Sequence, residues 1–270
     1  MSFLSVITVN YRSGLILSEC LDSFFRIDPP SDFEVIVINN DLASDLAPVQ
    51  NRKWPSTSFI QNRANLGFAA AVNLGLGRSQ GEFVLLLNPD IIVQRGSIQS
   101  LLDTMGYHAK AGIVMPLLRN PDGSLQYSCR RFYTYPTLLL RRAPLRWMSP
   151  NHPLVQQHLM LDWKHNSLAE VDWGLGAAML IRRAAIEDCG LFDERFFLYF
   201  EDVDLCVRMW RRGWSVFYNP ESTMVHSHRR DSARSWFHPA KRHHTLSLLK
   251  FIRKYQGNLG NRCHVRGQTE

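Results

Sequence analysis

The sequence predicts an α/β protein with an open, mostly parallel sheet, and three observations support that prediction. Two short runs rich in β-branched apolar residues, 3–9 and 33–39, are typical of buried strands. Between them, apolar residues recur at helical spacing from Leu15 to Phe25. A third apolar run, 83–87, is the clearest strand of the chain. Strands that alternate with helices in this way form a mostly parallel sheet flanked by helices.

Weaker signals outline the other elements. A helix is expected at 68–76, entered through Gly67, and a Pro-Asp-Gly turn at 121–123 is expected to join two strands. Residues 124–170 contain four prolines and are expected to be irregular, with a mobile loop. The other expected elements are strands at 59–60, 112–115, 177–181, 215–218 and 223–225, and helices at 184–189, 203–212 and 240–255.

Length and composition favour one ordered domain. With 270 residues, 45% of them apolar, the chain can bury a sizeable core. It lacks the run of about 18 apolar residues that a membrane span needs, and its start has neither the basic region nor the cleavage site of a signal peptide. The five cysteines are scattered without a C-x-x-C pair, which favours reduced thiols in a cytosolic protein over a disulfide framework.

The net charge of +7 suits an anionic partner, which could be a nucleic acid, a membrane surface or a small substrate. Aromatic residues lie in apolar runs and not among Lys and Arg, which weighs against nucleic acid. The basic clusters at 130–146 and 241–266 serve either as a membrane-docking surface or only for solubility. Apolar residues at 138–140 and 145–148, placed between arginines, favour docking on an anionic membrane.

Polar clusters follow three of the expected strands, at 10–11, 39–41 and 88–90. Ligands of an open parallel sheet bind beyond the carboxyl ends of its strands. The sequence has neither a P-loop nor a Gly-rich dinucleotide motif, whereas amides and carboxylates can pair with base edges and ribose hydroxyls. The clusters therefore indicate a nucleoside site, although Asn and Asp also end strands without binding any ligand.

Two further groups of residues are candidates for chemistry. Asp90 and His226 could hold a divalent metal, although His228 competes for that role and a single His is more often structural. Glu201 and Asp202 follow an aromatic run and open an expected helix. Acidic residues are common in a first helical turn, but crowding against aromatic residues raises a carboxyl pKa and favours a general base.

These motifs, in this order, resemble glycosyltransferase family 2, whose members are inverting enzymes with the fold called GT-A. Within this family the chain resembles bacterial rhamnosyltransferases of O-antigen or cell-wall synthesis, which share its Asn-Pro-Asp and Pro-Asp-Gly-Ser segments. The resemblance covers about residues 3–250 and rests on the segments 5–11, 35–41, 65–68, 87–90, 176–179 and 197–205, with Asn73, Arg208, Gly213 and His226.

The resemblance implies a role for each candidate. Asp202 would deprotonate the acceptor hydroxyl, with Glu201 as the alternative base, and Asp90 and His226 would hold Mg²⁺ or Mn²⁺ on the donor diphosphate. The family usually has Asp at position 39 and an Asp-x-Asp metal motif, so Asn39 and Asn88 depart from it, and metal affinity would depend mainly on Asp90. The implied donor-binding residues are Val9, Tyr11, Asn39, Asp41, Asn65, Gly67, Asn88, Gly176, Arg229 and Arg230.

The implied enzyme moves a sugar from a dTDP- or UDP-linked donor, with L-rhamnose from dTDP-rhamnose preferred, to a hydroxyl of a lipid-linked or polysaccharide acceptor. It would act in the cytoplasm, peripherally at the inner face of the cytoplasmic membrane. We expect a catalytic domain at 1–238, with a nucleotide-sugar half at 1–95 and an acceptor half at 96–238, and a helical basic tail at 239–270. The alternatives are a sugar nucleotidyltransferase, which would need a Gly-rich loop after its first strand, and a non-catalytic basic protein that binds nucleic acid or membrane.

Overall fold

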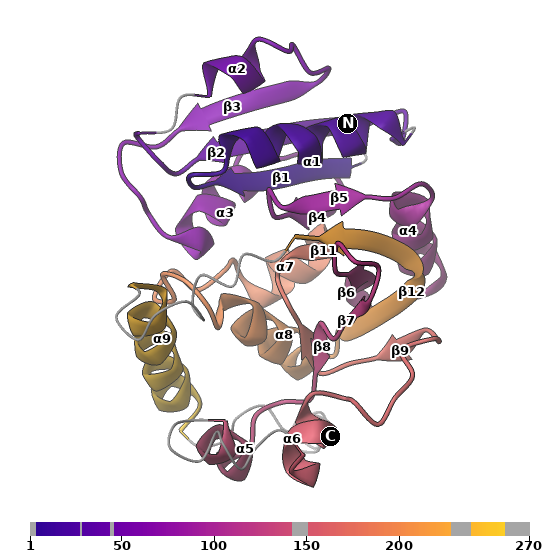
Figure 1. Ribbon diagram of the computed structural model, residues 1–270, viewed down its shortest axis with the longest axis vertical. Coiled ribbons are helices and arrows are strands. Elements are labelled where there is room, and N and C mark those ends of the chain that lie inside the picture. Colours follow the sequence, from indigo (N-terminus) through magenta and orange to yellow (C-terminus); the bar gives the residue numbers. More distant parts are fainter. Residues whose placement is uncertain (1–3, 28, 44–45, 142–150, 228–238, 257–270) are drawn as a thin grey trace.

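The computed structural model describes residues 4–27, 29–43, 46–141, 151–227 and 239–256 (Figure 1). Its strands are β1 (Leu4–Asn10), β2 (Phe33–Asn39), β3 (Thr57–Gln61), β4 (Phe83–Leu87), β5 (Ile91–Val93), β6 (Ala111–Arg119), β7 (Leu125–Gln126), β8 (Cys129–Arg130), β9 (Ala169–Glu170), β10 (Trp173–Gly174), β11 (Ala178–Arg182) and β12 (Ser215–His226). Its helices are α1 (Gly14–Arg26), α2 (Ala47–Gln50), α3 (Phe68–Leu76), α4 (Ser97–Tyr107), α5 (Tyr135–Leu140), α6 (Pro153–His158), α7 (Arg183–Cys189), α8 (Glu201–Arg211) and α9 (Pro239–Tyr255).

The main sheet has the strand order β3-β2-β1-β4-β11-β6-β12-β5. The first four strands run parallel to one another, and β12 is parallel to β6. The strand β11 is antiparallel to both of its neighbours, and β5 is antiparallel to β12. The predicted α/β fold with a mostly parallel central sheet is therefore confirmed.

Both faces of this sheet are covered by helices, which explains the continuous apolar runs of its strands. In β1, Leu4 and Val6 pack in one core cluster together with residues of α1 and α4. Ile7 and Val9 belong to a second cluster, which includes residues of α3, α7 and α8. Alternate side chains of one strand thus pack in two different core clusters, because the pleat points successive side chains to opposite faces of the sheet.

Strand β12 is one continuous strand, whereas the sequence predicted two short ones. Its register against β6 shifts between Asn219 and Thr223. Pro220 lies in that interval and has no N–H to donate to the ladder, so the strand bulges there and then continues. The Asn219 amide donates to Thr104 Oγ1 of α4 at 2.8 Å and fixes the bulge. This extension carries the chain on to His226, at the end of the strand.

Several elements were not predicted. The three-residue strand β5 and the helix α4 follow β4 directly, where the sequence indicated only an abrupt strand end. Residues 124–170, which were expected to be irregular, contain α5, α6 and the short strands β7 to β9. Part of that region, 142–150, lies outside the described residues, so the expected mobile loop is not tested there.

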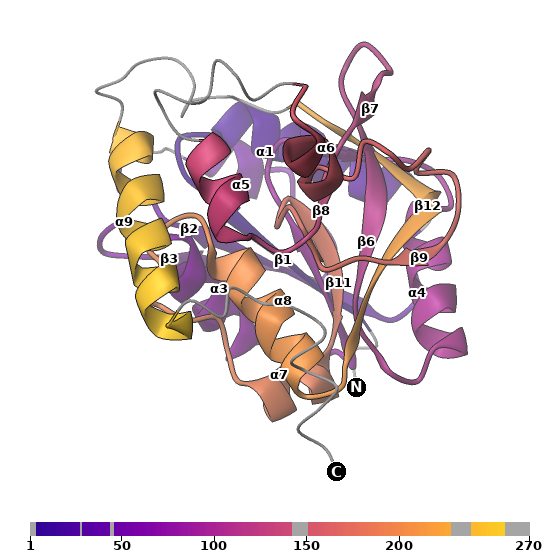
Figure 2. The same cartoon turned by 90° about the horizontal axis from the view of Figure 1, so that it is seen from below.

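The predicted basic helix near the end of the chain is α9, and its apolar side chains enter the core. Leu248, Phe251 and Tyr255 are buried in the same cluster as Phe196 and Phe200 of the preceding aromatic segment. Figure 2 shows α9 along one side of the molecule, next to α8. Within the described part of the chain, no helix is long and apolar enough to cross a membrane.

Candidate active site

The carboxyl ends of β1, β2 and β3 are joined by side-chain amides. Because the three strands are in parallel register, Asn10 lies opposite Asn39, and Asn39 lies opposite Gln61. Asn10 Nδ2 donates to Asn39 Oδ1 at 2.8 Å, and Asn39 Nδ2 donates to Gln61 Oε1 at 2.8 Å. Asn39 is only 3% exposed, so its amide is engaged within the protein. Here it cross-links three strand ends.

A second set of amides holds the loop that precedes α3. Asn40 Nδ2 donates to Asn65 Oδ1 at 2.8 Å, and Asn40 Oδ1 accepts from Asn62 Nδ2 at 3.1 Å and from the Leu66 N–H at 3.0 Å. Asn65 Oδ1 also accepts from the Gly67 N–H at 2.9 Å. We call the six amide residues of this region the amide edge: Asn10, Asn39, Asn40, Gln61, Asn62 and Asn65.

Three more predicted donor-binding residues lie beside the amide edge. Val9 is buried in β1, one residue before the strand end. Tyr11 is 44% exposed immediately after β1, with the Arg12 guanidinium 5.2 Å from its ring centroid. Asp41 is buried, and its Oδ1 accepts from the Ala43 N–H at 3.2 Å. Of the three, Tyr11 is the side chain that a ligand above the edge can reach most easily.

Gly67 joins the amide edge to the aromatic segment at 196–200. Its φ of 83° favours glycine, and a Cβ at this position would lie 2.5 Å from Phe197 O. The next residue, Phe68, donates its N–H to the same carbonyl at 2.8 Å. A side chain at position 67 would therefore separate the two segments, which explains why the motif has glycine here.

Asp90 and His226 are adjacent in space although they are far apart in the sequence. Strand β5 pairs with the end of β12 so that Ile91 lies opposite His226, and the Ser227 N–H donates to Asp90 O at 3.0 Å. His226 Nε2 lies 3.5 Å from Asp90 Oδ1, while Nδ1 is 2.6 Å from Gln126 Oε1. His226 is buried and Asp90 is partly exposed, so the pair is open to solvent on the Asp90 side.

This pair suits a divalent cation in its chemistry. One carboxylate oxygen and one imidazole nitrogen are acceptable to Mn²⁺, and Mg²⁺ is usually held by one or two carboxylates together with phosphates and water. No group of three or more His, Cys, Asp or Glu side chains in the described residues could hold a metal ion. A metal at Asp90 and His226 would therefore take its other ligands from a bound diphosphate and from water.

Asp202, in the first turn of α8, is held by two backbone donors. Its Oδ2 accepts from the Gly176 N–H at 3.0 Å, and its Oδ1 accepts from the Val203 N–H at 2.8 Å. Burial raises the pKa of Asp202, while these two N–H groups and the Arg130 charge lower it in part. A carboxylate in a fixed position with a raised pKa has the properties of a general base.

Glu201 differs from Asp202 in its surroundings. Its side chain is buried, and Oε2 has no hydrogen-bond partner among the described residues. Burial, followed by the charge of Asp202, raises the pKa of Glu201 well above its usual value. Glu201 therefore retains its proton more strongly, and Asp202 is the better candidate for the ionised base.

A short path of backbone hydrogen bonds connects Asp202 to the Asp90–His226 pair. Asp202 contacts Gly176, and the next residue, Ala177, accepts at its carbonyl from the Asn88 N–H at 2.8 Å. Asn88 is two residues from Asp90. The antiparallel strand β11, inserted between β4 and β6, thus brings the base and the Asn88–Asp90 turn to the same edge of the sheet.

Two residues of this region were missed as site residues. Gln126 contacts His226, and the charge of Arg130 lies close enough to Asp202 to lower its pKa. Burial and the charge of Arg141 lower the pKa of Arg130 to about 10. Both residues lie in the stretch expected to be irregular, and the Arg130-Arg131 pair was the only signal in the sequence. The predicted diphosphate ligands Arg229 and Arg230, and the alternative ligand His228, lie outside the described residues.

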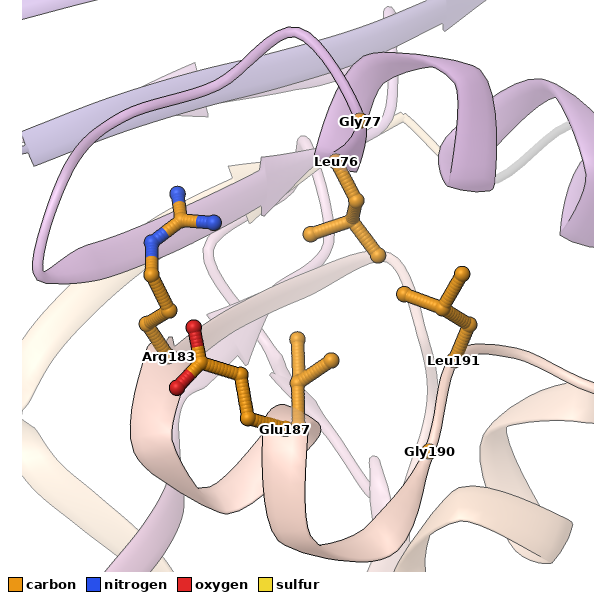
Figure 3. A pocket seen from close by; sticks show the side chains of 7 residues that line it. Leu76, Gly77, Arg183, Glu187, Gly190 and Leu191 are labelled. Atoms are coloured by element: carbon orange, nitrogen blue, oxygen red, sulfur yellow. The ribbon is translucent and has the colours of Figure 1, made fainter.

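A surface pocket of about 330 Å³ lies between the end of α3 and α7 (Figure 3). It is lined by Leu76, Arg183, Glu187 and Leu191, among others. Arg182, just before α7, pairs with Phe83 at the start of β4, so this pocket is at the amino end of the parallel strands. It lies away from the edge that carries Asp90 and Asp202 and is not a candidate for the nucleotide.

Comparisons with known proteins identify the family and the fold of the chain. The chain is 29% identical over 267 residues to the N-acetylglucosaminyl-diphospho-decaprenol L-rhamnosyltransferase of Mycobacterium tuberculosis, a match that covers 94% of this chain and 85% of that protein. The mannosyltransferase PcManGT of Pyrobaculum calidifontis, solved in complex with GDP-Man and Mn²⁺, has a TM-score of 0.62 at 18% identity. That match covers 93% of this chain and 64% of the mannosyltransferase, so the chain spans less than two thirds of its length.

The fold is also shared with S. aureus TarS 1–349 in complex with UDP-GlcNAc, with a TM-score of 0.63 at 15% identity over 97% of this chain and 69% of that chain. Residues 5–168 match the family described as Glycosyl transferase family 2, and residues 139–261 match Glycosyl transferase family group 2. The first match alone covers more than half of the sequence and contains the amide edge and Asp90. The chain therefore belongs to glycosyl transferase family 2 and is a glycosyltransferase.

Proposed function

We propose that this enzyme transfers L-rhamnose from dTDP-rhamnose to a hydroxyl group of a lipid-linked or polysaccharide acceptor, with inversion at the anomeric carbon. The observation that carries the proposal is the position of Asp202. It is connected to the Asn88–Asp90 turn through the hydrogen bonds of Gly176 and Ala177, and its pKa is raised. In this proposal the nucleotide binds beyond the amide edge, with Tyr11, Asp41 and Asn65 nearest to the base and ribose.

The reaction is a single displacement. Asp202 accepts the proton of the acceptor hydroxyl as the new C–O bond forms at the anomeric carbon. The bond between that carbon and the diphosphate oxygen breaks on the opposite face, and its electron pair leaves with the nucleotide. The Gly176 and Val203 N–H groups hold the carboxylate in one orientation throughout. Such positioned proton transfer contributes about 10²–10⁴ in rate.

Asp90 and His226 would hold Mg²⁺ or Mn²⁺, which when bound would neutralise charge on the leaving diphosphate. The chemistry of the pair fits, because a carboxylate oxygen faces an imidazole nitrogen at 3.5 Å. Arg229 and Arg230, which follow His226 closely in the sequence, are proposed as further diphosphate contacts. Asn88 in place of an acid predicts weaker metal binding than an Asp-x-Asp motif would give.

The donor and acceptor are inferred from similarity. The M. tuberculosis relative is named for rhamnosyl transfer to a decaprenol-linked N-acetylglucosaminyl diphosphate, and it aligns over nearly the whole chain. An acceptor carried on a lipid would bring the enzyme to the inner face of the cytoplasmic membrane, so we propose a peripheral protein in the cytoplasm. We also propose that residues 1–95 bind the nucleotide sugar and residues 96–238 the acceptor.

Two neighbouring helices offer a surface for that membrane. Leu139 of α5 and Leu249 of α9 are 63% and 58% exposed, and Arg141, Arg242 and Arg253 around them are exposed as well. The two helices lie near each other in both views (Figures 1 and 2). Basic residues near an anionic surface contribute about 1 kcal/mol each. The rest of the proposed basic surface, 142–146 and 257–266, lies outside the described residues.

The test is a donor screen that follows release of the nucleoside diphosphate. Wild type and Asp202→Asn are compared with dTDP-rhamnose, UDP-GlcNAc and other UDP- and dTDP-sugars, with Mn²⁺, Mg²⁺ or EDTA. We expect turnover of dTDP-rhamnose that needs the metal and falls about 10²–10⁴-fold in the variant. Asp162→Asn, at an exposed carboxylate, serves as the control and should keep full turnover. Turnover of a different sugar would replace the donor, and an unchanged Asp202→Asn enzyme would exclude this base.

A further inference from the structure

The hairpin after β6 is connected to His226 by a continuous chain of side-chain hydrogen bonds. Asp122 Oδ1 lies 2.6 Å from Ser124 Oγ, and Ser124 Oγ lies 2.9 Å from Asn120 Nδ2. Asn120 Oδ1 lies 2.9 Å from Gln126 Nε2, and Gln126 Oε1 lies 2.6 Å from His226 Nδ1. We call these five residues the hairpin chain. It reaches His226 because β7 and β12 flank β6, with Gln126 opposite Leu118 and Leu118 opposite Met224.

The direction of every bond in the hairpin chain is fixed by its first member. The pKa of Asp122 is lowered by the hydrogen bonds from the Ser124 side chain and backbone, so its carboxylate is ionised and can only accept. The Ser124 hydroxyl therefore donates to Asp122, and its oxygen accepts from the Asn120 NH₂. Asn120 then turns its oxygen toward Gln126, whose NH₂ donates to it. Gln126 can present only its oxygen to His226.

This polarity determines which nitrogen of His226 carries the proton. Since Gln126 Oε1 is an acceptor, His226 Nδ1 must be the donor in the 2.6 Å contact. In the neutral ring Nε2 then has the lone pair, and it faces Asp90 Oδ1 at 3.5 Å. Two acceptors facing each other in a largely buried place repel unless a cation or a proton lies between them. The hairpin chain thus prepares the pair to receive a cation.

We propose that Gln126, oriented by Asn120 and ultimately by Asp122, is a positioning residue that holds neutral His226 in the Nδ1–H tautomer and directs Nε2 toward the metal. The inference rests on the metal site of the proposed function, but the tautomer itself does not require a metal. Partners of this kind on metal-binding histidines fix the tautomer and the ring orientation, and their removal typically costs 10–100-fold in metal affinity. The Pro-Asp-Gly-Ser turn, which lies outside the catalytic centre, would thereby orient His226.

The tautomer can be measured without metal by ¹⁵N NMR of histidine-labelled protein, at a pH at which the ring is neutral. The chain has ten histidines, and the His226 signals are assigned by their loss in His226→Gln. We expect the Nδ1–H tautomer in the wild type. In Gln126→Met the Nε2–H tautomer should increase, because Nδ1 loses its acceptor while a proton on Nε2 can donate to Asp90.

Two substitutions at Asn120 separate the effect of its hydrogen-bond acceptor from the effect of its side-chain packing. Asn120→Asp keeps an acceptor opposite the Gln126 NH₂ and should preserve the wild-type tautomer. Asn120→Leu removes that acceptor, so the Gln126 amide is free to rotate and the tautomer should become mixed. The turn itself is held by backbone bonds from Asn120 N to Ser124 O and from Gly123 N to Asn120 O, so both variants should fold. Thermal unfolding monitored by circular dichroism checks this.

Metal affinity is then measured by isothermal titration of Mn²⁺ in the presence of UDP and, separately, of dTDP. We expect Gln126→Met to weaken Mn²⁺ binding about 10–100-fold and Asn120→Asp to remain near wild type. A wild-type Nε2–H tautomer, or equal behaviour of Asn120→Asp and Asn120→Leu, would overturn the inference. If the tautomer is as proposed but Mn²⁺ does not bind the wild type with either nucleotide, the metal site of the proposed function fails, and the hairpin chain still orients His226.

Discussion

The amide edge and the region around α8 both border the candidate active site, and they are held together by different forces. The amide edge consists of neutral groups that bond to one another across parallel strands. Beside α8 the groups are charged. Buried Asp204 accepts from Arg208 Nε at 2.8 Å and from the Tyr255 hydroxyl at 2.7 Å, and Lys254 donates to the same carboxylate.

The two regions also differ in the sequence separation of the residues that bond to each other. Asn10 and Asn39 are 29 residues apart and are aligned by neighbouring strands of one β-α-β unit. Lys254 and Asp204 are 50 residues apart, and their contact requires α9 to pack against α8. The amide edge is thus positioned by strand register, whereas the start of α8, with Glu201 and Asp202, is secured by a helix from the end of the described chain.

The largest expected effect on stability comes from breaking the charged side. Lys254→Met leaves Asp204 buried with one cation fewer and also removes the 2.7 Å pair with Asp193 Oδ2. We expect a loss of about 3 kcal/mol in the free energy of unfolding, at the low end for a broken buried pair because Arg208 and Tyr255 still bond Asp204. Lys250→Met is the matched control, since Lys250 is exposed on the same helix and bonds only a backbone carbonyl. Urea unfolding measures both, and equal losses would show that α9 is not held by this ion pair.

A smaller loss in the free energy of unfolding is expected when the neutral hydrogen bonds of the amide edge are broken. Asn39→Ala leaves Asn10 Nδ2 and Gln61 Oε1 without their Asn39 partner at a buried place, which costs about 1–3 kcal/mol. The same variant should also bind UDP or dTDP more weakly, because three strand ends lose their cross-link. Asn166→Ala, at an exposed asparagine, controls for the loss of an amide. If Asn39→Ala destabilised the protein more than Lys254→Met, the contrast between the two sides would be wrong.

The smallest effect concerns pH and distinguishes Glu201 from its neighbour. The pKa of Glu201 is raised well above its usual value of 4.5, so its contribution to stability is complete below that pH and is lost as the pH rises through the folded-state pKa. Glu201→Gln cannot ionise. The variant should therefore gain stability relative to the wild type as the pH increases from 4 to 9. Melting temperatures across this range provide the measurement, and a constant difference would contradict the raised pKa.

Much of the fold could be predicted because its strongest signals are local. Strand β4 and helix α3 occur at the residues predicted. A run of five apolar residues predicts a buried strand, and apolar residues at helical spacing after Gly67 predict a helix. Strand β5 has only three residues, too short for any period to emerge. Two separate strands were predicted at 215–218 and 223–225, but neighbouring β6 carries the ladder past Pro220 as a bulge.

The candidate site was harder to predict, because it depends on which strands become neighbours. The sequence indicated Asp90 and His226 as candidate metal ligands and Asp202 as the candidate base, each at an element end. Their proximity follows from the pairing of β5 with β12 and from the insertion of β11, and no local pattern encodes either. Asn39 was expected to bind the donor nucleotide, which stays a prediction; in the structure its amide bonds to two neighbouring strands. The polarity that Gln126 imposes on His226 becomes evident only from the chain of contacts.

The pairing of β5 with the end of β12 has a consequence for synthesis on the ribosome. Chains emerge from the amino terminus, and early segments can begin to fold before later ones exist. The parallel strands of the amide edge are all made early, whereas β12 is the last strand of the described chain. A nascent chain can therefore assemble its amide edge long before His226 reaches Asp90. Cation binding at that pair would report that the sheet is complete.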